Sequence, residues 1–246
     1  MPNRRRLKFA IVSLLLLAGV LFTAYVLFIS GAFMRRPSFE RFPVQGIDVS
    51  HHQGDVDWER VATDRRGAFA YMKASEGGDF KDRKFAENWS RAKAFGIPRG
   101  AYHFFTLCRP GLDQARNFVD SLKTDFGELP PAIDLEFLGN CSKRPSREEL
   151  LREVNAFVEE LKRHDQRKPI FYVTSDFSRK YIEGLENSYP AHENWKRSLL
   201  WEPSGDWVFW QFAETGRVEG VEGPVDLNVF YGSREEFAQH LAGPKD

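Results

Sequence analysis

The stretch AIDLEFLGNCSKRPSREELLREVNAFVEELKRHDQRKPIFYVT, residues 132–174, contains two short apolar runs with an amphipathic segment between them. Ser146 precedes two acidic residues, and the apolar residues that follow recur at helical spacing, which predicts a helix over 146–164. The flanking runs, 132–137 and 170–174, have the length and composition of buried strands. A strand, a helix and a second strand in this order indicate a β/α unit.

Similar units extend from this stretch in both directions. Further strands are expected at 46–50, 68–75, 100–106, 198–201, 207–212 and 225–230, and further helices at 57–66, 82–95 and 111–126. After residue 174 the apolar runs are separated mainly by loops. We therefore expect an α/β fold, a modified TIM-like β/α barrel of about eight strands with helices mainly in its first five units.

The N-terminal segment has a different composition. From Phe9 to Met34 no side chain is charged, and a helix of this length would reach about 37 Å, enough to cross a hydrocarbon core of ~30 Å. A basic start and small residues near the end of the run also fit a cleavable signal peptide. We expect a signal-anchor or transmembrane helix over 1–34, a linker over 35–45 and a barrel domain over 46–243. The barrel would then lie outside the cytoplasm, on the periplasmic side in a Gram-negative cell, or be secreted if the helix is cleaved.

The net charge of zero conceals an uneven distribution. The chain has 35 Lys and Arg against 35 Asp and Glu, but six of the basic residues and none of the acids lie within residues 1–36. The remainder therefore carries 29 basic against 35 acidic groups. An acidic body of this kind lacks the basic surface that binds polyanions, so nucleic acid is not an expected partner.

Cys108 and Cys141 are the only cysteines of the chain. An even number in an exported protein favours a disulfide, the alternative being two unpaired thiols. Each cysteine follows a predicted strand by a few residues, and the two strands are neighbours in a barrel, so the Cα atoms could approach within bridging range. Neither has the spacing of a metal site, and no metal is expected.

Four acidic residues interrupt apolar strand runs: Asp48, Asp134, Glu136 and Asp226. An unpaired carboxylate is costly in such a setting, and strand ends on one face of a β/α barrel collect catalytic groups. Asp134 and Glu136 are two residues apart, so their side chains point to the same side with Cα atoms ~6.5 Å apart. Repulsion should keep one of the two protonated, and a protonated acid beside an ionised one is what glycosidic cleavage requires. The alternative is a carboxylate network with no catalytic role.

Five more residues are candidates for substrate contacts in the same cleft: Tyr102, Tyr172, Glu76, Trp201 and Trp210. Strand alternation allows only one of Tyr102 and His103 to face the cleft, and we expect it to be Tyr102. Glu76 could support the acids or pair with Lys73. The two tryptophans could stack on sugar rings or belong to the core.

Six short motifs, in this order along the chain, resemble glycoside hydrolase family 25: GIDVS at 46–50, YMKASEG at 71–77, GAYHF at 100–104, DLE at 134–136, WQF at 210–212 and VDLNVF at 225–230. The resemblance covers roughly residues 45–231. It implies a modified β/α barrel and lysozyme (N-acetylmuramidase) activity, cutting the β-1,4 bond between N-acetylmuramic acid and N-acetylglucosamine without a cofactor.

The resemblance also implies roles for single residues. Glu136 would be the general acid, and Asp134 the partner carboxylate, acting as nucleophile or orienting the substrate acetamido group. Asp48 and Asp226 would line the acidic cleft, and the WQF motif makes Gln211 a candidate for substrate binding.

The segment after residue 200 departs from the family pattern, which predicts a different cleft wall. Peptidoglycan glycan strands are the expected substrate, and the membrane is an expected partner through the N-terminal helix. The alternative function is a catalytically silent carbohydrate-binding or scaffold protein of the envelope, against which both retained acids argue. Chitin-like polymers would need the same chemistry, but the motif typical of chitinase barrels is not found.

Overall fold

The computed structural model describes residues 13–23, 25 and 36–242, and its contacts divide the chain into two units, Met1–Arg36 and Pro37–Asp246. In the first unit, residues 13–23 are helical. Within the described residues, no helix combines the length and apolar character that crossing a membrane requires. The rest of the predicted anchor segment lies outside the described residues.

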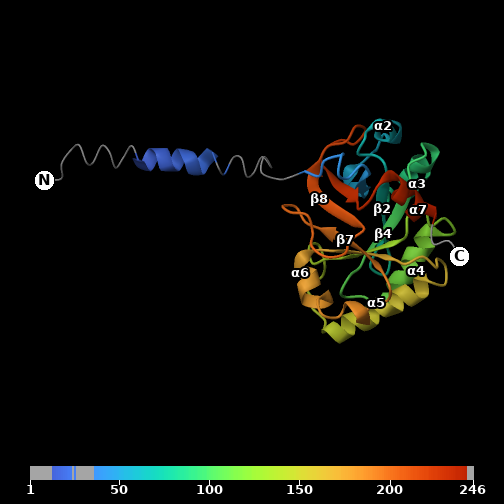
Figure 1. The fold of residues 1–246 in the computed structure, drawn as a ribbon. Coiled ribbons are helices and arrows are strands. Elements are labelled where there is room, and N and C mark those ends of the chain that lie inside the picture. The colour runs from blue at the N-terminus through green and yellow to red at the C-terminus, as the bar shows by residue number, and fades with distance from the viewer. Residues whose placement is uncertain (1–12, 24, 26–35, 243–246) are drawn as a thin grey trace. The chain divides into compact units, whose positions relative to one another are not determined.

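The second unit is built around a sheet whose strands are β1 (Gln45–Val49), β2 (Ala70–Glu76), β3 (Phe80–Lys81), β4 (Arg99–Phe104), β5 (Ala132–Leu135), β6 (Ile170–Val173), β7 (Glu193–Arg197), β8 (Phe209–Gly216) and β9 (Val225–Phe230). Over the described part of the chain, eight of them close into a barrel through the pairing of β1 with both β2 and β9, while β3 is attached to the outside of β2 (Figure 1). The predicted TIM-like barrel is confirmed.

The direction of the last strand departs from a regular β/α barrel. The six pairings from β1–β2 to β7–β8 are parallel, whereas β9 runs antiparallel to both β8 and β1. The end of β1 therefore lies beside the start of β9, and Asp48 is the cross-strand partner of Asp226. This arrangement adds a residue early in β9 to the carboxyl end of the other strands.

The longer helices are α2 (Trp58–Thr63), α3 (Phe85–Ala94), α4 (Gly111–Leu122), α5 (Arg147–Leu161) and α7 (Arg234–Ala242), and shorter turns are η1 (His51–Gln53), α6 (Ser175–Phe177), η2 (Ser178–Ile182) and η3 (Glu186–Ser188). The first four longer helices follow the early strands, as predicted, and α4 and α5 pack side by side against the barrel (Figure 1). Ser146 caps α5 by accepting a hydrogen bond from the backbone N–H of Glu149, whose own side chain bonds back to Ser146.

The two faces of the strands pack into two different apolar layers. Ile133 and Leu135 of β5 belong to the larger layer between barrel and helices, and Ala132 belongs to the barrel interior. The interior is filled by aromatic rings such as Tyr71, which occupies the place where a side chain on Gly100 would lie, 2.2 Å from a Cβ atom built there. Only glycine therefore fits at this position without moving the ring.

Three elements differ from the sequence prediction. β7 spans Glu193–Arg197 rather than 198–201, because only one of its five residues, Trp195, is fully buried and the strand has no apolar run to reveal it. The short β3 and the C-terminal α7 were not predicted, and α7 contributes a single buried side chain, Phe237. The stretch expected as a linker contains three buried residues, Phe42, Val44 and Gln45, and the last of these already belongs to β1.

The predicted disulfide between Cys108 and Cys141 is present, with Cα atoms 6.3 Å apart and a sequence separation of 33. Asn140 reinforces this connection, because its side chain accepts from the N–H of Leu107 and donates to the carbonyl of Glu136. The loop that follows β5 is therefore tied to the loop that follows β4. In the chain-entropy model a loop of this length contributes about 3–4 kcal/mol to stability.

Candidate active site

The four predicted acids lie at one end of the barrel. Asp48 is the next-to-last residue of β1, and Asp226 is the second residue of the antiparallel β9. Asp134 lies near the end of β5, and Glu136 directly follows that strand. The charge of Asp48 raises the pKa of the other three, although burial is the larger cause for each of them. The structure thus brings the four acids together as one acid cluster, defined here as Asp48, Asp134, Glu136 and Asp226.

Asp48 is solvated by amides rather than by cations. Its Oδ2 accepts hydrogen bonds from Asn228 Nδ2 at 2.7 Å and Gln211 Nε2 at 3.0 Å. Burial raises the pKa of Asp48, and these two hydrogen bonds oppose that rise. Trp195 fixes the first amide by donating from Nε1 to Asn228 Oδ1 at 2.9 Å, and Tyr172 fixes the second by donating to Gln211 Oε1 at 2.8 Å.

Asp226 has a raised pKa and is hydrogen-bonded to Asp48. Burial, the charge of Asp48 and a hydrogen bond to Asp48 together raise the pKa of Asp226 to about 9, against an opposing effect of Arg197. Gln211 Nε2 also lies 3.2 Å from Asp226 Oδ2, so one amide serves both carboxyl groups. The hydrogen bond between the two carboxyl groups raises the pKa of Asp226 and lowers that of Asp48, so Asp226 is the partner that favours the proton.

Asp134 lies deeper in the barrel than Glu136. Burial and the charge of Glu136 raise its pKa well above the ordinary value, with Lys73 opposing. Its Oδ1 is buried and has no hydrogen-bond partner among the described residues. A carboxyl group with one uncommitted oxygen beside an acidic neighbour is suited to interact with a substrate group in the cleft.

Glu136 is partly buried and has a pKa near neutrality. Burial raises its pKa to about 7, while the Arg197 guanidinium lowers it and the Glu214 carboxylate raises it. A carboxyl group with this pKa holds a transferable proton over much of the neutral range. Arg197 forms an ion pair with Glu214, which moderates the effect of both on Glu136.

Lys73, a residue of β2, lowers the pKa of Asp134 by its positive charge. Its ammonium group lies 2.6 Å from Glu76 Oε2 and 4.8 Å from the ring centroid of Phe104. Of the two roles considered for Glu76, the structure therefore shows the pairing with Lys73, and the Glu76 charge also contributes to the raised pKa of Asp134.

Tyr102 faces the acid cluster, and its neighbour His103 faces the outer layer. Burial raises the pKa of Tyr102 well above 10, and the charges of Asp48 and Asp134 raise it further, so the phenol stays protonated. His103 is buried between Ser75 and Gln114, at 2.8 and 3.2 Å, and burial lowers its pKa to about 3.

Of the two tryptophan candidates, Trp210 belongs to the outer layer and Trp201 to an exposed loop. Trp210 is buried in the outer layer against Trp207 and Phe42, and its Nε1 donates to the carbonyl of Ser198. Alternation along β8 directs Gln211 inward and therefore Trp210 outward. Trp201 is 71% exposed on the loop between β7 and β8.

Four residues of the site were not singled out from the sequence: Asn228, Trp195, Arg197 and Glu214. The alternation of β9 could have indicated Asn228, because it lies two residues after Asp226 on the same face. Arg197 lay outside the strand expected at 198–201, so its inward direction could not be deduced.

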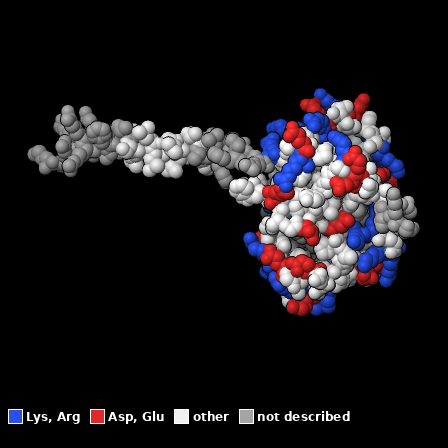
Figure 2. Space-filling model, in the orientation of Figure 1, with Lys and Arg blue, Asp and Glu red and all other residues white. Residues whose placement is uncertain are grey.

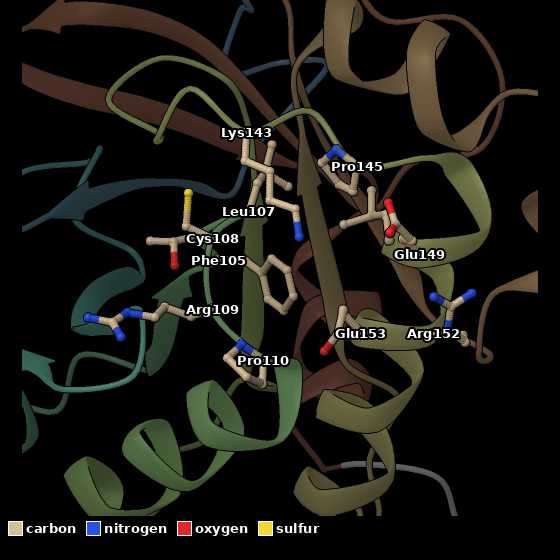
Figure 3. A pocket seen from close by; sticks show the side chains of 12 residues that line it. Phe105, Leu107, Cys108, Arg109, Pro110, Lys143, Pro145, Glu149, Arg152 and Glu153 are labelled. Atoms are coloured by element: carbon tan, nitrogen blue, oxygen red, sulfur yellow. The ribbon is translucent and has the colours of Figure 1, made fainter.

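A cavity of about 210 Å³ lies beside the disulfide, between the loop after β4 and the start of α5. Figure 3 shows Lys143 extending into it, while Arg109 points away. Its two acidic side chains, Glu149 and Glu153, accept hydrogen bonds from backbone N–H groups. None of the four acids of the cluster lines it.

On the face drawn in Figure 2, acidic and basic side chains are interspersed.

The chain matches the model of the family described as glycosyl hydrolases family 25 over residues 47–221. It is 35% identical over 215 residues to the uncharacterized protein YegX of Escherichia coli K12, a match that covers 83% of this chain and 76% of that protein. It is 37% identical over 206 residues to lysozyme M1 of Streptomyces globisporus, covering 77% of this chain and 68% of the relative.

Solved structures of a family 25 glycosyl hydrolase and of a bacterial lysozyme also resemble this chain. A family 25 glycosyl hydrolase from Bacillus anthracis superposes with a TM-score of 0.75 at 36% identity, covering 83% of this chain and 96% of that one. The bacterial lysozyme from Streptomyces coelicolor superposes with a TM-score of 0.68 at 34% identity, covering 81% and 95% of the two chains.

Proposed function

Because the chain belongs to glycosyl hydrolase family 25 and is a glycoside hydrolase, we propose that it cleaves the β-1,4 bond between N-acetylmuramic acid and N-acetylglucosamine in peptidoglycan. The observation that carries this proposal is the Asp134–Glu136 pair, two carboxyl groups with raised pKa values at the active end of the barrel. Relatives named lysozyme and N,O-diacetylmuramidase support the choice of substrate.

In the proposed mechanism Glu136 donates its proton to the glycosidic oxygen as the bond to the anomeric carbon breaks. In this mechanism Asp134 must be ionised, which burial and an ionised Glu136 oppose and the Lys73 ammonium favours. The ionised Asp134 stabilises the positive charge developing on the sugar, directly or by orienting the acetamido group. Ionisation of Asp48 or Asp226 adds to the negative potential of the cleft. Tyr102 remains a hydrogen-bond donor throughout, because its phenol does not ionise near neutral pH.

Digestion of purified peptidoglycan tests the bond that is cut. After borohydride reduction, the new ends released by the wild-type protein should be N-acetylmuramitol, identified by mass spectrometry. Ends reduced to N-acetylglucosaminitol would place the cut at the other glycosidic bond. Intact strands after incubation with folded protein would favour the catalytically silent alternative.

We also propose that the barrel acts outside the cytoplasm and that residues 1–34 tether it to the membrane, with residues 35–45 leading to the barrel domain. The support is the uncharged run from Phe9 to Met34 after a basic start.

Fractionation of cells that express the full chain tests the tether. The protein should sediment with membranes, resist extraction by high salt and be released by detergent. Alkaline carbonate should leave it in the membrane pellet. A mature protein that begins near Phe33 and is recovered in the soluble envelope fraction would instead establish a cleaved signal peptide.

A further inference from the structure

A second cavity, of about 340 Å³, opens at the carboxyl ends of β6 and β7. One wall is formed by α6 and η2, and the other by the loop between β7 and β8. The charged residues of its lining are Arg179, Lys196, Arg197, Glu183 and Glu202, and the hydroxyl of Thr174 lies among them. We call it the β6–β7 cavity.

Neither Asp134 nor Glu136 lines the β6–β7 cavity, but the cavity lies at the carboxyl end of β6, the strand that pairs with β5. In the barrel Leu135 is the cross-strand partner of Val173, and the residues that follow these two are Glu136 and Thr174. Val173 and Thr174 both line the cavity. Arg197 also lines it, and its charge acts on Glu136. A substituent on a sugar bound at Glu136 could therefore reach this cavity.

The charge of the β6–β7 cavity is opposite to that of the cleft. Three cationic side chains line it, of which Arg197 is paired with Glu214, and of its two acids Glu202 is paired with Arg41, at 2.8 Å. Among the residues that the structure describes, Arg179 and Lys196 therefore face one unpaired acid, Glu183. Arg179 is exposed, and within the described residues its guanidinium forms no hydrogen bond or ion pair. Lys196 is half-buried and donates to the carbonyl of Ser204 at 2.8 Å, which leaves two of its three N–H donors for a ligand.

The chemistry of the proposed substrate supplies an anion at this place. A muramyl residue carries a lactyl ether, whose carboxyl group is either free or amide-linked to a stem peptide that bears carboxylates of its own. An anion of this kind, next to the bond that is cut, would be repelled by the acid cluster unless cations received it. Arginine and lysine around a cavity lined with hydroxyl groups provide such a place.

We infer that the β6–β7 cavity is a subsite for a carboxylate on the muramyl residue, received by Arg179 and Lys196 beside Glu136. This inference rests on the proposed function and extends it, because it makes the acidic substituent of the glycan a determinant of binding. Either the lactyl carboxylate or a stem-peptide carboxylate could supply the charge.

The test measures binding of soluble peptidoglycan fragments by calorimetry, with Glu136→Gln in every protein so that no fragment is cut. Adding Arg179→Gln should weaken binding about five- to tenfold, the size expected when one charge-assisted contact is lost. The matched control is Lys180→Gln, which removes one charge from the next residue of η2. Lys180 does not line the β6–β7 cavity, and this change should alter binding less than twofold.

Three fragment preparations identify the carboxylate. An effect of Arg179→Gln confined to peptide-bearing fragments assigns it to the stem peptide, and an effect on amidase-treated fragments assigns it to the lactyl group. Fragments whose carboxyl groups have been amidated should bind weakly and lose nothing further with Arg179→Gln.

Equal effects of Arg179→Gln and Lys180→Gln, or an undiminished effect on amidated fragments, would overturn the subsite. Binding is measured without turnover, so the experiment can contradict the subsite without contradicting the proposed cleavage reaction, and the reverse. Arg179-dependent binding by a wild-type protein that releases no muramic acid ends would contradict the proposed function alone.

Discussion

Glu136→Gln is expected to leave the fold intact and to abolish nearly all lytic activity. The amide has the shape of the acid but no proton to transfer, and general acid catalysis contributes ~10²–10⁴ in rate. Burial already disfavours the charged form of Glu136, so a neutral side chain at this position should not lower the thermal unfolding temperature. The measurements are the release of reducing ends from peptidoglycan and the unfolding temperature.

Glu222→Gln is the matched control for this prediction. Glu222 is exposed and does not belong to the acid cluster, and the substitution is again glutamate to glutamine. The Glu222→Gln protein should therefore be as active as the wild type. Near wild-type lysis by the Glu136→Gln protein would mean that another group donates the proton.

Asp134→Asn is expected to impair activity severely and to change its pH dependence. The neutral amide cannot stabilise positive charge on the sugar, so kcat should fall. In the wild type the general acid must be protonated, so activity should decline above a pH of about 7, the pKa of Glu136. Removing the Asp134 charge removes repulsion between the pair, which favours ionisation of Glu136, and the high-pH limb should move to lower pH.

The residual activity of Asp134→Asn, measured as kcat/KM across pH 4–9, checks both parts. Carboxyl ¹³C chemical shifts of labelled glutamate would give the titration of Glu136 directly. If the profile keeps both its height and its position, the two carboxyl groups do not act as a coupled pair.

The fold was predictable where apolar residues recur at a regular spacing and polar residues mark the ends of an element. The α5 helix and its flanking strands follow from Ser146 and from the spacing of the apolar residues after it, because packing and capping are local. β7 was misplaced because its outward residues, such as Lys196, are only half-buried, so neither alternation nor an apolar run is visible.

The acids of the site were predictable, but the groups that hold them were not. A carboxylate inside an apolar strand is conspicuous, whereas Gln211 and Asn228 are ordinary until barrel closure places both amides on Asp48. Trp210 was a candidate on residue type alone, yet its strand face directs it to the outer layer. Arg197 could not be assigned, because its role depends on the register of a strand that lacks a sequence signal.

The antiparallel β9 links completion of the site to the order of folding. The carboxylate of Asp48 is solvated by amides that lie 163 and 180 residues later in the chain. Contacts between such distant segments form late, since the entropy of closing the loop between them is lost before the contact stabilises the structure. While the chain is being synthesised from its N-terminus, β1 therefore carries a carboxylate with neither of these partners. The acid cluster is complete only when the last strand is inserted, because Asp226 and Asn228 both belong to β9.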